Sequence, residues 1–212
     1  MGDILRRRGM MAAASGGPSY WDFEWDYSMG KLEEQSGWTY AKSGTAASSL
    51  ISDGEKVYAN NSGAYFQINP QDDNPILNMP NGYGTLEVTC YGKFYNSTGK
   101  GTRNARIFVA GDTASGNSRI QVYAFNGKWR INAAAGDNNP AIADASNNTV
   151  YTIRIALKGS AADIYVNNVL CVEDYDLSSL STGSKSALQV YSAGGSSYYT
   201  VWQSLKIHLG PN

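Results

Sequence analysis

Apolar and polar residues alternate through residues 149–173 in runs that short turns join. Because successive side chains of a strand point to opposite faces, this period of two is typical of half-buried antiparallel strands. Asn167 and Asn168 stand between two of these runs, and asparagine tolerates the positive φ angles that a two-residue hairpin turn requires. The turn fixes the register, for which we expect three pairs: Val166 with Val169, Tyr165 with Leu170, and Ile164 with Cys171.

A second hairpin is predicted over residues 119–134, where Asn126-Gly127 strongly favours a type I′ turn. This turn pairs Ala124 with Trp129 and Val122 with Ile131. The pairing gives the hairpin an apolar face and a mixed polar and aromatic face. The apolar face holds Ile120, Val122, Ala124, Trp129, Ile131 and Ala133, and the opposite face holds Gln121, Tyr123, Phe125, Lys128, Arg130 and Asn132.

Composition extends this pattern to the whole chain. The 212 residues include 23 glycines and 15 tyrosines, which suits many short strands joined by tight turns, and the length suits one domain. We therefore predict an all-β fold, a two-sheet antiparallel β-sandwich over residues 20–212, preceded by an extended N-terminal arm over residues 1–19. A net charge of −1 with 17% charged residues gives no sign of attraction to nucleic acid. No apolar run is long enough to span a bilayer.

The C-terminal half carries a resemblance to a known fold family. The run IYVNNVL, an acidic loop, and the closing strand YTVWQSLKIHLG resemble the second half of laminin G-like or concanavalin A-like jelly rolls. The resemblance extends more loosely back to about Tyr20. It implies a jelly-roll sandwich, and this fold hosts lectins, enzymes and structural proteins alike.

The arm MGDILRRRGMMAAASGGPS combines a basic patch with a short apolar run. The run is shorter than a secretory signal requires, and Arg6 breaks the myristoylation pattern, so we interpret it as an arm. It either lies along its own domain or docks in a neighbouring subunit, and we favour docking. The apolar residues would insert, and the arginines would pair with carboxylates. These docking residues are Ile4, Leu5, Arg6, Arg7, Arg8, Met10 and Met11.

The arm also carries a second resemblance, through the run ILRRRGMMAAASGG before a sandwich whose first strand is rich in Trp, Asp and Tyr. This arrangement is similar to small structural proteins encoded by gut bacteria and their bacteriophages. The resemblance implies a virion protein of the fibre or decoration type, held to other virion proteins by its arm and assembled as a homo-oligomer, for which we guess a trimer. The alternative is an extracellular, secreted carbohydrate-binding module.

The segment SYWDFEWDY alternates aromatic and acidic residues. Trp21, Phe23, Trp25 and Tyr27 are expected on one face, and Asp22, Glu24 and Asp26 on the other. Three spaced acids resemble the catalytic strand of laminarinase-type glycoside hydrolases, where two carboxylates perform retaining hydrolysis. In that family the order is Glu-x-Asp-x-Glu and the strand lies in the middle of the chain, whereas here the order is Asp-x-Glu-x-Asp and the strand is the first. The alternative to catalysis is that the three acids only form a solvent-facing side of the strand, which discourages pairing with another strand at the sheet edge. We favour this alternative and expect that the protein is not an enzyme.

Other candidate sites are sparse. Tyr123, Phe125, Arg130 and Asn132 form a face that could stack on a host-surface glycan or seal a subunit contact, unless a loop or sheet covers it. Asp72, Asp73 and Asn74 could hold Ca²⁺, although their spacing matches no defined calcium loop, so no cofactor is expected. His208 has no nucleophile motif around it. Cys90 and Cys171 lie in predicted strands, where free thiols are the favoured state.

Overall fold

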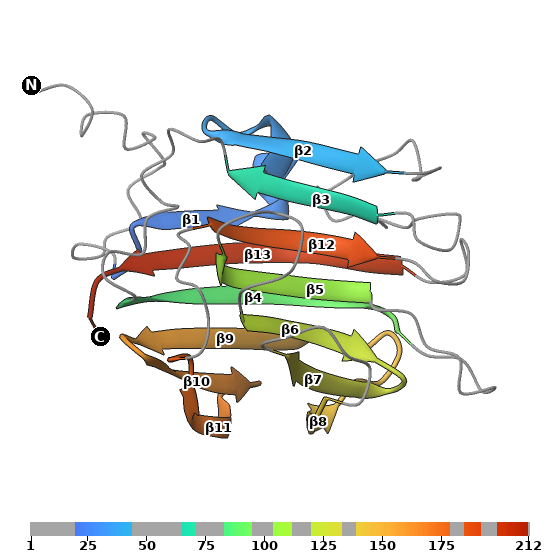
Figure 1. Cartoon of the computed structure of the whole chain (residues 1–212). Coiled ribbons are helices and arrows are strands. Elements are labelled where there is room, and N and C mark those ends of the chain that lie inside the picture. Colours follow the sequence, from blue (N-terminus) through green and yellow to red (C-terminus); the bar gives the residue numbers. More distant parts are fainter. Residues whose placement is uncertain are drawn as a thin grey trace, which may run out of the picture.

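A computed structural model describes residues 20–43, 65–70, 83–94, 104–111, 120–132, 139–178, 185–191 and 199–211. Within these ranges the chain forms two antiparallel sheets, and Figure 1 shows the strands of one sheet stacked over those of the other. The prediction of an all-β, two-sheet sandwich is confirmed. None of the described residues forms a helix that is long and apolar enough to cross a membrane.

The first sheet has six strands, in the order β1-β13-β4-β9-β10-β11. The first described strand therefore lies beside the last, because β1 pairs with β13 along one edge. The bounds are β1 (Phe23–Asp26), β13 (Tyr199–Leu209), β4 (Tyr83–Lys93), β9 (Tyr151–Lys158), β10 (Ala161–Val166) and β11 (Val169–Asp176).

The second sheet has seven strands, in the order β2-β3-β12-β5-β6-β7-β8. Strand β12 lies between β3 and β5, so one strand from near the end of the chain is inserted among earlier strands. The bounds are β2 (Trp38–Ser43), β3 (Tyr65–Pro70), β12 (Lys185–Tyr191), β5 (Asn104–Gly111), β6 (Ile120–Phe125), β7 (Lys128–Asn132) and β8 (Ala141–Asp144).

The core lies between the two sheets, and every second residue of the central strands contributes to it. The alternation seen in the sequence explains this, because the apolar phase of each strand faces the partner sheet. Trp25, Trp129 and Trp202 are among the largest fully buried side chains. The six-stranded sheet supplies Leu86, Val88, Ile153, Ile155, Ile164 and Val166, and the seven-stranded sheet supplies Ile107, Val109, Ile120, Val122, Ala124 and Ile131.

Both predicted turns have the expected backbone. Asn126 and Gly127 have φ of 52° and 72°, and Ala124 pairs with Trp129 as predicted. Asn167 and Asn168 have φ of 51° and 64°, which is the left-handed conformation that a two-residue hairpin requires. The pairs Val122 with Ile131, Val166 with Val169 and Tyr165 with Leu170 also agree with the prediction.

The third predicted pair of the later hairpin is wrong. Ile164 pairs with Val172 and not with Cys171, because a bulge adds one residue to β11 at this point. A second irregularity follows between Ile164 and Ala162, where Asp174 has a φ of 51°. The turn fixes register only up to the first bulge, and the apolar pattern does not show where a bulge will fall.

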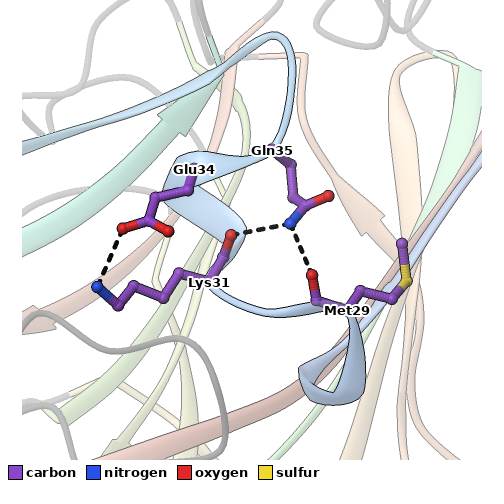
Figure 2. A network of polar contacts seen from close by, with 4 residues as sticks. All are labelled: Met29, Lys31, Glu34 and Gln35. Carbon is purple, nitrogen blue, oxygen red and sulfur yellow. Dashed lines mark hydrogen bonds and ion pairs between the residues drawn. The ribbon is translucent and has the colours of Figure 1, made fainter.

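The chain passes from the first sheet to the second through two 3₁₀ turns, η2 (Tyr27–Met29) and η3 (Leu32–Glu34). Gln35 joins them, because its Nε2 donates to the carbonyl oxygens of Met29 and Lys31 at 3.0 and 3.1 Å (Figure 2). Lys31 also pairs with Glu34 at 3.0 Å. One amide side chain thus satisfies two carbonyl groups that no strand would satisfy at this corner.

The prediction that the four aromatic residues of the first strand share one face is wrong. Trp25 is buried and Phe23 packs against the core, but Trp21 precedes β1 and Tyr27 is 49% exposed. The strand ends after Asp26, whose carboxylate accepts hydrogen bonds from the backbone N–H and the hydroxyl of Ser28. This cap starts η2 and takes Tyr27 out of the alternation.

Both cysteines are free. Cys90 is fully buried in the core on β4, and burial raises the pKa of its thiol well above the ordinary value. Cys171 is half-buried at the bulge of β11.

Candidate functional site

The outer face of the six-stranded sheet carries a hollow of about 700 Å³. Its position follows from the register, which sets Thr85 of β4 opposite Ala156 of β9, and Arg154 of β9 opposite Tyr165 of β10. These residues belong to the strand phase that faces away from the core. We call this site the aromatic hollow. It is lined by Tyr20, Trp21, Tyr83, Thr85, Arg154, Ala156, Leu157, Lys158, Asp163, Tyr165 and Pro211.

One wall of the aromatic hollow is held in place by the pairing of β1 with β13. Asp22 Oδ2 accepts a hydrogen bond from the Leu209 N–H at 2.8 Å, and the Asp22 N–H donates to the Ile207 carbonyl at 2.9 Å. The same Oδ2 lies 3.1 Å from His208 Nδ1. These contacts fix the residue next to Trp21 and so position the aromatic pair at the start of the described chain.

The two aromatic rings of this wall are themselves packed. Tyr20 stacks on the His208 imidazole at a centroid distance of 4.1 Å, and it meets Trp21 edge-on at 5.0 Å. Lys206 Nζ lies 5.7 Å from the Trp21 ring centroid, within reach of a cation–π interaction. Tyr20 is nevertheless 51% exposed, so its ring is still accessible to a ligand.

The opposite wall depends on a close approach at the turn between β9 and β10. Gly159 has a φ of +75°, and a Cβ on it would lie 3.1 Å from the hydroxyl oxygen of Tyr83. Glycine is favoured at position 159 for two reasons: it adopts this positive φ without strain, and it has no Cβ to press against the Tyr83 ring. Tyr83 is 38% exposed, and its ring forms this side of the aromatic hollow.

Charged side chains stand among the rings. The Arg154 guanidinium carbon lies 3.9 Å from the Tyr165 ring centroid, a stacked cation–π arrangement. Lys158 Nζ pairs with Asp163 at 2.8 Å and with Asp174 at 2.6 Å. Asp163 Oδ1 also accepts the Asp174 N–H at 2.9 Å, so these three residues hold the second irregularity of β11 in place.

Lys158 and Asp163 shift each other's pKa. Burial alone would raise the pKa of Asp163, but the hydrogen bond from the Asp174 N–H and the contact with Lys158 outweigh it, and the pKa lies below the ordinary value. Hydrogen bonds to Asp163 and Asp174 raise the pKa of Lys158 above its ordinary value. Lys158 and Asp163 are therefore both charged at neutral pH.

The site predicted from sequence lies on the other sheet, and its central ring, Tyr123, is buried. Tyr123 is 1% exposed, and its hydroxyl accepts a hydrogen bond from Asn139 Nδ2 at 3.0 Å. Arg130 Nη1 donates to the Asn139 carbonyl. Phe125 is half-buried, and the Asn132 backbone pairs with Gln121. The Tyr123 ring is buried and its hydroxyl is hydrogen-bonded to Asn139, so the ring is not accessible to a sugar in this structure, which agrees with the alternative of a covered face.

A second polar contact lies beside it on the same face. Arg106 Nη2 donates to Gln121 Oε1 at 2.6 Å, and these two residues are only 8% and 3% exposed. Arg106, Gln121 and Tyr123 are therefore buried polar side chains on this face of the seven-stranded sheet.

The three acids of the first strand each make a structural contact. Asp22 holds the backbone of β13, Asp26 caps η2, and Glu24 lies 3.9 Å from Lys206. Within the described ranges, no three His, Cys, Asp or Glu side chains gather as a metal site. The predicted docking residues of the arm and the calcium candidates at positions 72–74 lie outside the described residues.

The sequence reasoning did not identify the aromatic hollow. Its residues come from four separate segments of the chain, and no segment by itself has a sequence pattern that indicates a binding site. The available signal was Tyr165 beside the Asn167-Asn168 turn, in the outward phase of β10, where an aromatic side chain is not needed for the core.

Comparisons with solved structures agree with this architecture. A sialidase chain aligns with a TM-score of 0.63 at 10% identity, over 90% of this chain but only 19% of the sialidase. The Ca²⁺-bound lumenal domain of VIP36 aligns with a TM-score of 0.59 at 8% identity, over 86% of this chain and 88% of that one. The carbohydrate-binding module CBM66 from Bacillus subtilis aligns with a TM-score of 0.52 at 18% identity, over 82% and 97%.

The fold is a concanavalin A-like jelly roll. No protein-family model and no curated protein matches the sequence. At these low identities the likeness establishes the jelly roll, and the chemistry of its outer faces must be argued from this chain's own residues.

Proposed function

We propose that this concanavalin A-like domain is a non-enzymatic glycan-binding module and that the aromatic hollow is its binding site. The observation that carries the proposal is the gathering of Tyr20, Trp21, Tyr83 and Tyr165 around one hollow that also contains charged side chains. The solved structures similar to it include the carbohydrate-binding module CBM66 and a carbohydrate recognition domain of Emp46p, which supports the same class of ligand.

The lining suits a sugar for physical reasons. A pyranose ring has apolar C–H faces that pack on aromatic rings and hydroxyl groups around its edge that need hydrogen-bond partners. Tyr83 and Trp21 offer ring surfaces, while Arg154, Lys158 and Asp163 offer donors and acceptors. A volume of about 700 Å³ lies within the usual range of small-ligand sites.

The acidic strand does not compete with this proposal. Retaining hydrolysis needs a nucleophile and an acid facing one sugar, whereas Asp22 and Asp26 accept hydrogen bonds from backbone N–H groups. We therefore expect no release of reducing sugar from β-glucans, and the variant Glu24→Gln should behave as the parent does. Release of reducing sugar that Glu24→Gln abolishes would contradict the non-enzymatic assignment.

The test is a glycan array followed by calorimetry with the best ligand, using the full chain. Trp21→Ala and Tyr83→Ala each remove a ring that contributes about 0.5–1.5 kcal/mol, so each should raise Kd by roughly 2- to 13-fold. Tyr27→Ala is the matched control, because Tyr27 is 49% exposed and does not line the aromatic hollow. It should leave Kd unchanged.

Two results would contradict the proposal. One is the absence of binding to any glycan on the array. The other is binding that Tyr27→Ala weakens as much as Trp21→Ala does, because the site would then lie elsewhere.

Attachment of the domain to a virion stays a prediction from the sequence. Residues 1–19, through which it would dock with other virion proteins or assemble as a homo-oligomer, lie outside the described residues. A particle-bound head that reads a host glycan is compatible with the proposed site. Deleting residues 2–17 should leave a folded domain that binds glycan but no longer enters the particle, and unimpaired incorporation would contradict the docking role.

A further inference from the structure

Arg154 stands apart from the other cations around the aromatic hollow. Lys158 is paired with two carboxylates, and Lys206 lies 3.9 Å from Glu24. Among the described residues, Arg154 has no carboxylate oxygen within 4.0 Å, although Glu87 is opposite it in the strand register. Its Nε is buried and has no hydrogen-bond partner in the described part of the chain.

The position of this guanidinium is fixed. Arg154 projects from β9, a central strand with neighbours on both sides, and its guanidinium stacks on Tyr165 at 3.9 Å. The stacking leaves the edge of the planar group, with its Nη atoms, for hydrogen bonds. A guanidinium edge matches a carboxylate in a bidentate arrangement, which an ammonium group does not provide.

The charge balance of the lining also favours an anion. Arg154 and Lys158 are the two cations of the lining and Asp163 is the one anion among these residues, so the lining itself carries a net charge of +1. Lys158 pairs with Asp163 and also with Asp174, which lies outside the lining, and neither carboxylate pairs with Arg154. Arg154 therefore presents a positive charge to the aromatic hollow that no carboxylate of the described residues contacts directly. A ligand that brings a negative charge would compensate it, and a neutral sugar would not.

We propose that the aromatic hollow selects acidic sugars, with Arg154 binding the sugar carboxylate while the neighbouring rings contact the pyranose. This inference rests on the proposed function and narrows its ligand to sugars that carry a carboxylate, such as uronic or sialic acids. Arg154 is the specificity-determining residue, and the rings supply affinity that acidic and neutral sugars share.

The test compares matched ligands on the full chain by calorimetry: oligogalacturonate with its methyl ester, and sialyllactose with lactose. A hydrogen-bonded charge pair typically favours the acidic member by about 10- to 100-fold in Kd. Arg154→Met keeps the length and apolar stem, and it should abolish the preference for the acid while neutral binding persists. Arg154→Lys keeps the charge without the planar fork and should retain only part of the preference.

Lys128→Met is the charge control, because it removes one positive charge from β7 of the other sheet, where Lys128 pairs with Asp144. It should leave the preference intact. Equal affinity for acidic and neutral members would overturn the inference while leaving glycan binding established. A preference that survives Arg154→Met would overturn it too. Failure to bind any glycan on the array would instead remove the proposed function itself.

Discussion

Replacing Gly159 by alanine should destabilise the protein and distort the aromatic hollow through a single contact. The backbone φ of +75° strains any residue with a Cβ, at about 1 kcal/mol for alanine. The new Cβ would also lie 3.1 Å from the hydroxyl oxygen of Tyr83 and 3.3 Å from its Cζ. These distances are shorter than ordinary van der Waals contact, so the ring must move by a few tenths of an ångström.

The two costs can be separated. Overpacking a buried core costs about 1–3 kcal/mol, but Tyr83 is 38% exposed and its ring can move, so we expect a smaller cost of about 0.5–1 kcal/mol here. Gly159→Ala should therefore cost about 1.5–2 kcal/mol in the wild-type protein. In a Tyr83→Ala background the ring is gone, and the same substitution should cost only the backbone strain of about 1 kcal/mol.

The assay is urea denaturation of the four proteins of this double-mutant cycle, monitored by tryptophan fluorescence, with glycan affinity measured in parallel. We expect a coupling free energy of about 0.5–1 kcal/mol between the two positions. Gly159→Ala should also weaken glycan binding, because the displaced ring forms one wall of the site. A coupling below about 0.3 kcal/mol would refute the reasoning, since Tyr83 would then not pack on the turn.

Three further outcomes can be checked on the same protein. Gly92→Ala would bring a Cβ to 2.2 Å from a backbone carbonyl oxygen of β13, so we expect a loss of about 3 kcal/mol or more, or failure to fold, in denaturation experiments; a neutral result would contradict the pairing of β4 with β13. Because the folded-state pKa of Asp163 is lowered, its stabilisation is present above the unfolded value of about 3.9 and is lost as pH falls through the folded value. The pH titration of stability should be flatter in Asp163→Asn, and an identical profile would show that the contact with Lys158 contributes nothing. Burial raises the pKa of the Cys90 thiol, so iodoacetamide should label native protein only at Cys171, with Cys90 reacting after unfolding; labelling of native Cys90 would contradict its burial.

Much of the sandwich could be predicted because its determinants are local. The Asn126-Gly127 and Asn167-Asn168 turns each select a backbone conformation, and the period-two pattern then decides which face is buried. Register failed at Cys171, where a bulge changed the pairing without changing the composition of the strand. A turn determines the pairs next to it, and a bulge further along depends on contacts such as Asp163 with Asp174.

The candidate site could not be predicted for a different reason. The sequence shows that Tyr123 alternates away from the core, but not that it will be buried and hydrogen-bonded to Asn139. Tyr20 and Tyr83 are far apart in the chain, and only the order β1-β13-β4-β9 brings them to one hollow. Outward-facing residues are constrained by neither periodicity nor turn chemistry, so their grouping depends on long-range topology.

The pairing of β1 with β13 makes the aromatic hollow a reporter of complete folding. Asp22 and Leu209, whose hydrogen bond anchors one wall, are separated by 187 positions in the chain. On the ribosome, that wall cannot form until the residues of β13 have emerged, and contacts between such distant residues are slow to form. Ligand binding therefore distinguishes the finished sandwich from any partly folded form. A chain cut or permuted within β13 should lose ligand binding before the rest of the sandwich unfolds.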